Sequence, residues 1–551
     1  MRRVLLTLCA AVTGLVLAAV PAVEAAAAQP PAEFGTQWHD PVTAGPPVSV
    51  PDTPSCRVTV ADTEFRDYTP YTGTYRPPQA CGRHWNKVVL RLEGAVAGRQ
   101  FDRLGYLHIG GVEVLRTSTP EPSPQGITWK VEKDVTRYAA TLHEQQPVEM
   151  LIGNTVDGTY TGVIKVKVTL TFYTAQGRAK EAAVPDKVLT LQNAHSQDGA
   201  YEGQLTTPRN SERIVAEVYA TGSGGGCEEF WYLTVPDGVP YSCRAKDGPY
   251  REVRVSVDGK LAGIAAPYPT VWTGGWSNPF LWYVIPGPRA FDVRPVEYDL
   301  TPFAGLLNDG RPHRIAVSVT GLPAGQAGWS TPTNVLVWQD AKARQVTGGL
   351  LTDQAGDLVN KTAYEPGSER RLTASGGHRL TVSGYLDTSH GRVTTTVTRT
   401  LTAHSTHRWN ADETTDALQA RWNDDETVVT AHGPGAAGLS DRHPAPTTTR
   451  AHRTYTMDGA TTVDSANRLR TTMTMGDRAD TTTLRGTRPT DRSRLDDTYT
   501  GDASYNQNVP REQRHATGVS RERYRLYGPG SRYDRTLATA QGELTEDRYG
   551  C

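Results

Sequence analysis

The sequence predicts an all-β protein, with two tandem jelly-roll-like β-sandwich domains followed by a C-terminal β-rich domain. Glycine (53 of 551 residues) and proline (37) are abundant beside 24 tyrosines and 11 tryptophans, which is typical of a folded, turn-rich chain. Residues 87–93, 106–109 and 162–172 alternate polar and apolar side chains and are rich in β-branched residues, a pattern that favours half-buried strands. The segment 131–136 recurs 165 positions later as 296–301, with Val, Glu, Asp and Thr in register, which indicates a duplicated domain.

The N-terminus predicts a secretory signal at residues 1–28. Arg2 and Arg3 precede an apolar run over 4–20, and mostly small residues follow up to Ala28, where we expect cleavage. The apolar run is at the short end for a membrane span, and proline-rich polar chain follows it. We therefore expect a secreted, extracellular protein that has no membrane partner once the signal is removed.

Pattern and composition divide the remaining chain into four parts. Residues 29–55 are proline-rich and lack periodicity, so they form a leader or an arm that follows the surface. Each copy of the repeat has room for about eight strands, which favours jelly-roll domains at 56–175 and 176–342. After about residue 343 lysine becomes scarce while threonine and arginine accumulate, as in 392–401, which predicts a β-rich domain at 343–551 with polar-faced strands. Its many Asp and Arg residues from about 476 onward predict exposed strands and loops.

The repeated segment also predicts a local structure. Asp134-Val135-Thr136 and Asp299-Leu300-Thr301 each follow a strand pattern. We expect both to start a short helical turn between two strands, with an Asp or Thr oxygen capping it.

The cysteines predict two disulfides. Outside the signal, which contains Cys9, the chain has Cys56, Cys81, Cys227, Cys243 and Cys551. In an oxidising compartment the local pairs Cys56 with Cys81 and Cys227 with Cys243 are the natural bridges, each contributing about 3 kcal/mol, although four cysteines allow three connectivities. Cys551 is left over and is either free or bridged to another chain. The spacings do not resemble a zinc site, so no metal is expected.

The charge balance argues against nucleic acid as a partner. Lys and Arg number 58, Asp and Glu 59, and the formal net charge is -1. No whole-molecule field of either sign therefore exists to gather nucleic acid or an anionic membrane.

The usual catalytic signatures are absent, and two acidic runs remain. The sequence contains no nucleophile elbow, HExxH, phosphate loop or dinucleotide fingerprint, and Ser440–His443 has the character of a loop rather than of a triad. Residues 100–103 place an acid beside an arginine and an aromatic residue, and residues 226–232 place two acids beside a cysteine and three aromatic residues. Acids among aromatic residues suit pKa shifts and sugar stacking.

Three interpretations of these runs stay open at this point. They fit a hydrolase with paired carboxylates, or a sugar-binding module without chemistry. They equally fit ordinary structure, in which Asp102 and Arg103 form a strand-edge ion pair worth under about 1 kcal/mol and Glu228 lies on a solvated face.

Several long strings resemble one family. FDRLGYLHIGGVEVLRTSTPEP (101–122), GITWKVEKDVTRYAATL (126–142) and YTGVIKVKVTLTFY (160–173) are similar to the peptide N-glycanases of the plant type A class. So is a second block that includes EEFWYL (228–233) and the strings in 249–313, so that the likeness runs from about 50 to 340. These enzymes are amidases that cut the linkage between asparagine and the innermost N-acetylglucosamine.

A more distant likeness to the bacterial type F glycanase, built of two tandem eight-stranded jelly rolls, implies the site residues. Its essential acid lies in a Trp-Asp-Arg run, matched here by Phe101-Asp102-Arg103, and its second acid in a Gly-Cys-Ala-Glu-Trp run, matched by 226–230. The resemblance therefore implies that Asp102 and Glu229 are catalytic and meet in a cleft between the two domains. A third, assisting acid has no counterpart in 150–154.

The resemblance implies a secreted amidase that releases intact N-glycans and converts Asn to Asp, with N-glycosylated peptides or glycoproteins as partners and without a metal or organic cofactor. A glycan-binding protein that has lost catalysis and a two-carboxylate glycoside hydrolase are the alternatives. Trp272, Trp276 and Trp282 fit either a core or a sugar platform. The residues expected to bind substrate are Phe101, Arg103, Glu228, Phe230 and Trp231.

Overall fold

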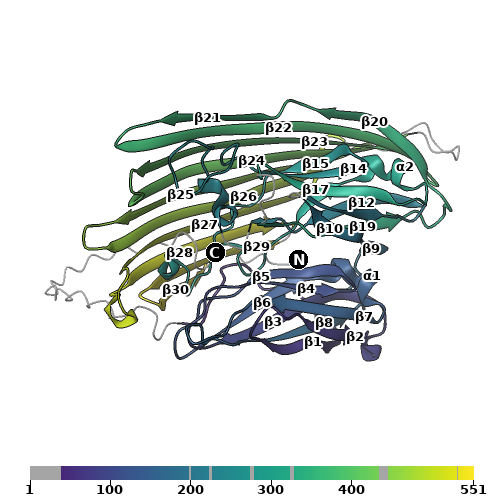
Figure 1. The fold of residues 1–551 in the computed structure, drawn as a ribbon. Helices are drawn as coiled ribbons and strands as arrows, with labels where there is room; N and C mark the ends of the chain where they lie inside the picture. Colours follow the sequence, from purple (N-terminus) through teal and green to yellow (C-terminus); the bar gives the residue numbers. More distant parts are fainter. Residues whose placement is uncertain are drawn as a thin grey trace, which may run out of the picture.

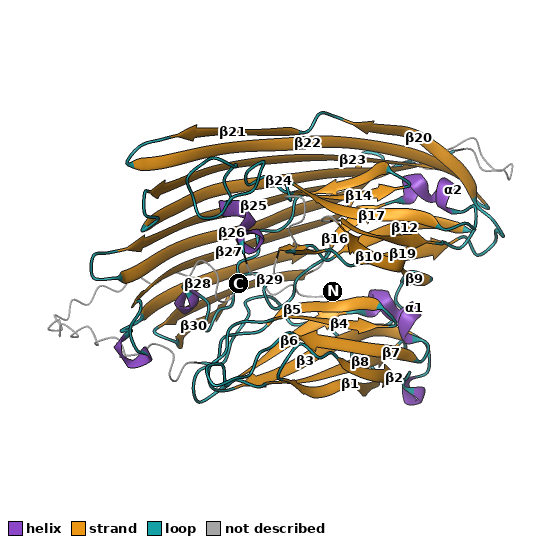
Figure 2. Ribbon diagram, viewed as in Figure 1, coloured by secondary structure: helices purple, strands orange, loops and turns teal. Residues whose placement is uncertain are grey.

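The computed structural model describes residues 39–550, apart from 198–199, 223–225, 273–277, 323–327, 434–444 and 530. The predicted signal peptide, Trp276, Ser440–His443 and Cys551 lie outside the described residues. Among the described residues, antiparallel sheets make up the fold, and helices are limited to short turns (Figures 1 and 2). The all-β class is confirmed.

The first part of the chain is a sandwich of two four-stranded sheets, with strand orders β1-β8-β3-β6 and β2-β7-β4-β5. Apolar side chains from alternating positions, such as Leu90, Leu92 and Leu170, are fully buried between the sheets. The three segments predicted as strands fall on β3, β4 and β8. The strands are β1 (Ser55–Phe65), β2 (Tyr71–Tyr75), β3 (Trp85–Val96), β4 (Leu104–Ile109), β5 (Val112–Ser118), β6 (Ile127–Asp134), β7 (Gln146–Ile152) and β8 (Ile164–Thr174).

The second part contains a five-stranded sheet, β10-β11-β17-β14-β15, a four-stranded sheet, β16-β12-β19-β9, and the small pair β13-β18. A short 3-10 helix, η3 (Cys227–Leu233), lies between β13 and β14, and η5 (Pro279–Leu281) follows β15. The strands are β9 (Lys187–Thr190), β10 (Gln192–Gln197), β11 (Ala200–Leu205), β12 (Ser211–Val218), β13 (Thr221–Gly222), β14 (Glu252–Val257), β15 (Lys260–Ala265), β16 (Val296–Asp299), β17 (His313–Thr320), β18 (Trp329–Ser330) and β19 (Thr333–Gln339).

The repeated segment adopts the same local structure in both sandwiches. In the first, β6 leads into η2 (Thr136–Tyr138) and α1 (Ala139–Leu142), and in the second, β16 leads into η6 (Thr301–Phe303) and α2 (Ala304–Leu307). Each Asp caps its turn as predicted, since Asp134 and Asp299 each accept a hydrogen bond from the N–H two residues on, both at 3.0 Å.

The threonine of each copy is also held in the same way. The Thr136 hydroxyl accepts the N–H of Val88 at 2.9 Å, and the Thr301 hydroxyl accepts the N–H of Ile214 at 3.2 Å. Because the contacts with β3 and β12 correspond, the two sandwiches are equivalent at this point, as the duplication predicts.

The C-terminal part is one antiparallel sheet of eleven strands, most of them long, that runs the width of the molecule (Figure 1). Elements of the second sandwich, among them β15, α2 and η5, pack against it. The strands are β20 (Thr347–Ala355), β21 (Val359–Glu365), β22 (Glu369–Thr388), β23 (Gly391–Asn410), β24 (Thr415–His432), β25 (Thr447–Val463), β26 (Arg468–Arg485), β27 (Arg488–Asn506), β28 (Thr517–Gly528), β29 (Ser531–Ala540) and β30 (Glu543–Tyr549), with η7 (Arg511–Gln513) between β27 and β28.

The expectation of exposed strands from 476 onward is wrong for one face of this sheet. Tyr499 is fully buried against Trp282 of the second sandwich, with ring centroids 4.7 Å apart. Even the acids Asp497 and Glu522 are buried. Composition failed here because side chains of a strand alternate between two faces, so a strand with few large apolar residues still presents one face to the second sandwich.

The N-terminal segment, from residue 39 onward, packs against all three parts of the protein. Asp40 accepts two hydrogen bonds from Thr128 of the first sandwich, and the N–H of Val42 donates to Val284 of the second. The hydroxyl of Tyr533, on β29, donates to the Ala44 carbonyl at 3.1 Å. This part of the predicted arm therefore ties the three parts together.

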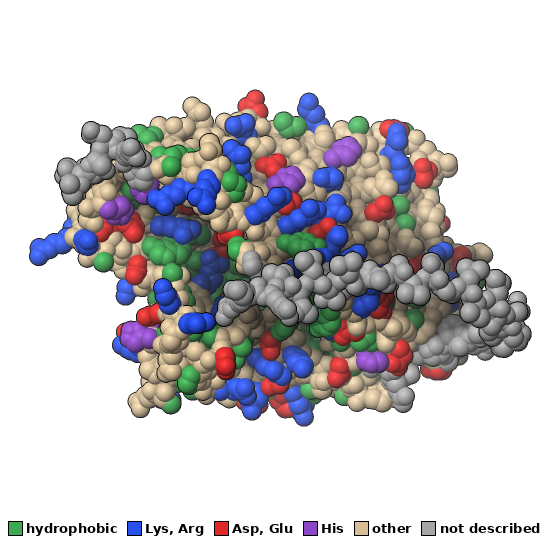
Figure 3. All heavy atoms as spheres, turned by 180° about the vertical axis from the view of Figure 1, so that it is seen from behind, with side chains coloured by type: hydrophobic (Ala, Val, Ile, Leu, Met, Phe, Trp, Pro, Cys, Tyr) green, Lys and Arg blue, Asp and Glu red, His purple; other side chains and the backbone are tan. Residues whose placement is uncertain are grey.

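Both predicted disulfides are present, Cys56–Cys81 and Cys227–Cys243. Side chains of both charge signs are interspersed over the face shown in Figure 3, in keeping with the small net charge. Among the described residues, none of the helices has the length and apolar character needed to span a membrane.

Candidate active site

A cavity of about 770 Å³ lies where the three parts of the chain meet. It brings together Asp102 and Glu229, the two acids that the sequence places 127 positions apart in different sandwiches. Its lining is Arg99, Gln100, Phe101, Asp102, Glu121 and Pro122 from the first sandwich, Glu229, Pro279 and Tyr283 from the second, and Tyr505, Val509, Pro510, Arg511 and Arg514 from the C-terminal part.

The buried side chain of Gln100 fixes the loop that carries Asp102 just before β4. Its amide nitrogen donates to the carbonyls of Thr155 at 3.0 Å and Gly162 at 3.1 Å, and its oxygen accepts the N–H of Phe101 at 3.0 Å. Because every polar atom of this amide is engaged, the backbone next to Asp102 is tightly held.

Arg103 acts on this loop rather than in the cavity lining. Its guanidinium donates to the Gln100 oxygen at 2.5 Å, and its N–H donates to the Thr119 hydroxyl at 2.9 Å. These contacts do not support the expected substrate-binding role of Arg103. They favour an indirect role, in which Arg103 holds Gln100 and so the position of Asp102.

Phe101 is the aromatic residue at the rim. Its side chain is 45% exposed and contacts the ring of Tyr160 at a centroid distance of 5.0 Å. The guanidinium of Arg99 lies 5.6 Å from the centre of the Tyr160 ring. An exposed aromatic face beside a polar cavity suits the apolar side of a sugar ring.

Glu229 lies on η3, whose position depends on two glycines. Gly226 precedes the turn with φ of +79°, a conformation that side chains with a Cβ rarely adopt. At Gly222 an added Cβ would lie 2.2 Å from the carbonyl oxygen of Glu228. The chain can therefore approach η3 this closely only because position 222 has no side chain.

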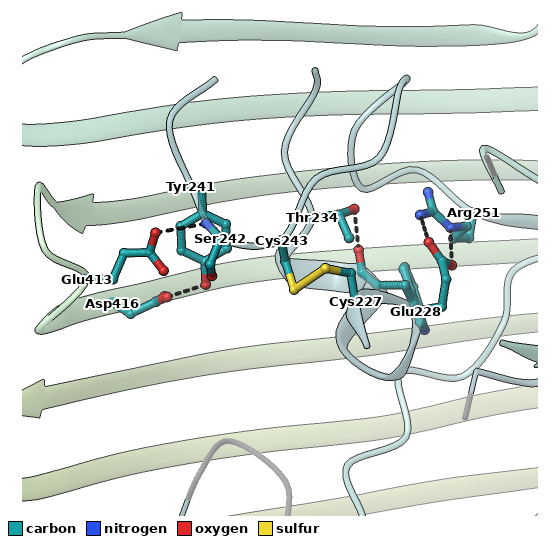
Figure 4. The surroundings of a disulfide bond; sticks show 10 residues. Cys227, Glu228, Thr234, Tyr241, Ser242, Cys243, Arg251, Glu413 and Asp416 are labelled. Atoms are coloured by element: carbon teal, nitrogen blue, oxygen red, sulfur yellow. Dashed lines mark hydrogen bonds and ion pairs between the residues drawn. A yellow bond between two sulfur atoms is a disulfide. The ribbon is translucent and has the colours of Figure 1, made fainter. Parts of the chain in front are cut away.

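Glu228, next to Glu229, points into the protein instead of the cavity. Its carboxylate accepts hydrogen bonds from the guanidinium of Arg251 at 2.6 and 3.0 Å (Figure 4). It also accepts one from the indole N–H of Trp329 at 2.6 Å. Both partners of the ion pair are almost completely buried. The expected substrate-binding role does not fit this position, because the carboxylate is fully engaged inside the protein.

The Cys227–Cys243 disulfide closes the same loop, and the loop is attached to the C-terminal sheet. The hydroxyl of Tyr241 donates to Asp416 on β24 at 2.5 Å (Figure 4). The disulfide and the Glu228 ion pair thus hold η3 from two sides and set the direction of Glu229.

The aromatic residues after Glu229 are packed in the core. Trp231 is 2% exposed and its ring contacts those of Trp329 and Trp422, while Phe230 is partly buried against the same core. Neither is among the residues that line the cavity. The sequence left open whether Trp272 and Trp282 fill a core or form a sugar platform. Both are buried.

Glu121 is an acid of the cavity that the sequence interpretation did not select. It follows β5 and is 9% exposed. Burial and the charge of Asp102 raise the pKa of Glu121 well above its usual range, and Arg514, Arg99 and Arg103 oppose this rise. The signal was present in the sequence, because Glu121 lies near the end of one of the strings that carry the family resemblance, which closes at Pro122.

The region of the expected third acid is occupied by a structural amide. The side-chain nitrogen of Asn154 donates to the carbonyls of Phe65 at 2.9 Å and Gly162 at 3.1 Å. Asn154 is completely buried. It therefore joins neighbouring loops of the first sandwich.

The C-terminal part supplies one wall, which the sequence interpretation also missed. Tyr505 and the loop between β27 and β28 reach the cavity, with Arg511 and Arg514 facing the acids. Burial and the neighbouring Arg514 lower the pKa of Arg511. No local pattern marks this loop, since its partners lie roughly two hundred to four hundred residues earlier in the chain.

Within the described residues, one group of potential metal ligands stands out, Glu212, Asp340 and His390, with ligand atoms within 4.8 Å of one another. None of the three lines the cavity. Asp340 already accepts hydrogen bonds from the backbone and hydroxyl of Ser389 and from the N–H of Lys342. These contacts account for the position of Asp340 without a metal.

Comparison with known proteins places the chain in a family. The family model described as "Peptide N-acetyl-beta-D-glucosaminyl asparaginase amidase A" matches residues 41–356, more than half of the chain. The curated "Peptide-N4-(N-acetyl-beta-glucosaminyl)asparagine amidase A" of Prunus dulcis is 31% identical over 382 residues, which cover 63% of this chain. The match spans 66% of the almond protein, just under two thirds of its length.

Among solved structures, one of PNGF-II is 14% identical and covers 52% of this chain and 65% of its own, with a TM-score of 0.35. A likeness at that level carries no argument about this site. The match to the family model spans both sandwiches, and the chain belongs to the peptide N-acetyl-beta-D-glucosaminyl asparaginase amidase A family.

Proposed function

We propose that the protein is a secreted peptide N-glycanase. It hydrolyses the amide between asparagine and the innermost N-acetylglucosamine, releases the intact glycan and converts Asn to Asp. Family membership supports the reaction class, and one observation supports the site: Asp102 and Glu229, from different sandwiches, line the same cavity. The N-terminal signal pattern and the two disulfides support export, because structural disulfides persist in oxidising compartments.

The geometry suggests a division of labour between the two acids. An amide carbonyl is unreactive, so a water molecule must be activated and aligned against it. Asp102, on the loop held by Gln100, accepts a proton from that water. Glu229, from the second sandwich, orients the water or the innermost sugar, and the exposed ring of Phe101 stacks against the glycan core.

The test is incubation of the mature protein with an N-glycosylated peptide, followed by mass spectrometry of both products. The proposal predicts an intact free glycan and a peptide carrying Asp in place of Asn. A glycoside hydrolase would leave one sugar on an unchanged Asn. A protein that only binds glycans would retain the glycopeptide without turnover, and either result would reject the proposal.

A further inference from the structure

Glu121 is a buried carboxyl group in the same cavity as Asp102, and the proposed division of labour gives it no task. We propose that Glu121 is a catalytic residue, the general acid that protonates the nitrogen of the departing glycosylamine. This inference rests on the proposed peptide N-glycanase activity and adds the group that the leaving amine requires.

The position of Glu121 is fixed by its neighbours. Prolines stand on both sides, and Pro122 confines Glu121 to an extended conformation. Tyr283, from the second sandwich, donates its hydroxyl hydrogen bond to the Glu121 carboxyl. The side chain is therefore held from both sandwiches while it lines the cavity together with Asp102.

The charged groups around Glu121 decide its protonation. Asp102 lies on the first sandwich with Arg99 and Arg103, and Arg514 faces Glu121 from the C-terminal loop. Burial and the charge of Asp102 outweigh the three arginines, so that the pKa of Glu121 is raised well above its usual range. When two neighbouring carboxyl groups have unequal surroundings, one keeps a proton while the other is ionised. Here Glu121 keeps the proton and can act as the acid, and Asp102 is the base.

The reaction balances with these two groups. The water oxygen forms a bond to the Asn side-chain carbonyl carbon while one water proton passes to Asp102. The carbon–nitrogen bond then breaks as the Glu121 proton passes to the nitrogen, which gives an Asp carboxyl group and a glycosylamine. Return of the proton from Asp102 to Glu121 restores both groups without any co-reactant.

The experiment compares Glu121→Gln with wild type on two substrates, a glycopeptide and its analogue in which an ester replaces the glycosylated amide. An ester releases an oxygen leaving group that needs less protonation than an amine. We expect kcat on the amide to fall by roughly 10²–10⁴, kcat on the ester to be far less affected, and the alkaline limb of the wild-type pH profile to disappear. Glu144→Gln, an exposed acid of the same sandwich, is the matched control and is expected to match wild type.

Each other outcome overturns the inference. Unchanged kcat and pH profile would show that Glu121 carries no proton in the reaction. Equal losses on amide and ester would show that it only maintains the site. Absence of glycan release by wild type would instead reject the proposed function, so the two failures are distinguishable.

If Glu121→Gln does not fold, Tyr283→Phe gives an independent test. Loss of a hydrogen bond donated to the carboxylate raises the pKa of Glu121, because that bond favours the ionised form. The alkaline limb should then move to higher pH. A limb that stays in place or moves to lower pH would contradict the role of Glu121.

Discussion

The buried ion pair between Glu228 and Arg251 allows the positioning of Glu229 to be tested quantitatively. Glu228→Gln removes the negative charge and leaves the guanidinium of Arg251, 1% exposed, without its counter-ion. Breaking such a pair from one side costs about 3–5 kcal/mol. At about 2–4 °C per kcal/mol for a domain of this size, the second sandwich should melt roughly 6–20 °C lower in calorimetry. Because Glu229 is the next residue on η3, kcat on a glycopeptide should fall as well.

A surface pair provides the control. Glu365 and Arg371 form an ion pair with side chains 57% and 42% exposed, and Glu365→Gln should change stability by less than about 1 kcal/mol. Replacing Glu228 and Arg251 together by apolar residues should recover much of the loss, since no buried charge then remains unpaired. If Glu228→Gln has the same melting temperature as Glu365→Gln and keeps full kcat, the ion pair does not hold the site and the reasoning is refuted.

Two further predictions concern the disulfide and the pH dependence of stability. Removing Cys227–Cys243, which closes the loop of η3, by a double serine substitution should cost about 3 kcal/mol and lower kcat. The same change at Cys56–Cys81, which joins β1 to η1 and does not carry a lining residue, should cost stability alone, and equal effects on kcat would contradict this. Burial and the nearby Asp477 raise the pKa of Asp497 to about 7, so the folded state holds a proton that the unfolded chain releases near pH 4. Stability should therefore decline between about pH 4 and pH 7 in thermal scans, and Asp497→Asn should reduce this slope; an unchanged slope would show that Asp497 is not its source.

The sequence was sufficient for features that depend on short stretches of chain. The repeated Val-Glu-x-Asp-x-Thr segment predicted the strand, the cap and the helical turn of both sandwiches, because an Asp two residues before an unpaired N–H satisfies it locally. The cysteine pairs were likewise predicted, since each closes a short loop. Asp102 and Glu229 came from ordered strings that resemble a family, and the structure places both in one cavity.

The rest depends on contacts that no short stretch records. Glu228 and Glu229 are indistinguishable by type, but successive side chains on a 3-10 turn point about 120° apart, so only one of them can face the cavity. Glu121 lies between two prolines, and this local sequence is typical of an exposed turn. Only the folded structure shows that Glu121 is buried beside Asp102. Arg511 and Arg514 line the cavity because the C-terminal sheet packs against the second sandwich. Composition had instead predicted exposed strands and loops for this part of the chain.

The cavity between the sandwiches is proposed to hydrolyse the Asn amide and to leave the glycosidic bonds intact. Hydrolysis of a glycopeptide in water labelled with heavy oxygen tests it most directly. The account predicts that wild type places one labelled oxygen in the new Asp carboxyl group and that Asp102→Asn abolishes this incorporation. Label found on the sugar with Asn unchanged, or full incorporation by Asp102→Asn, would contradict it.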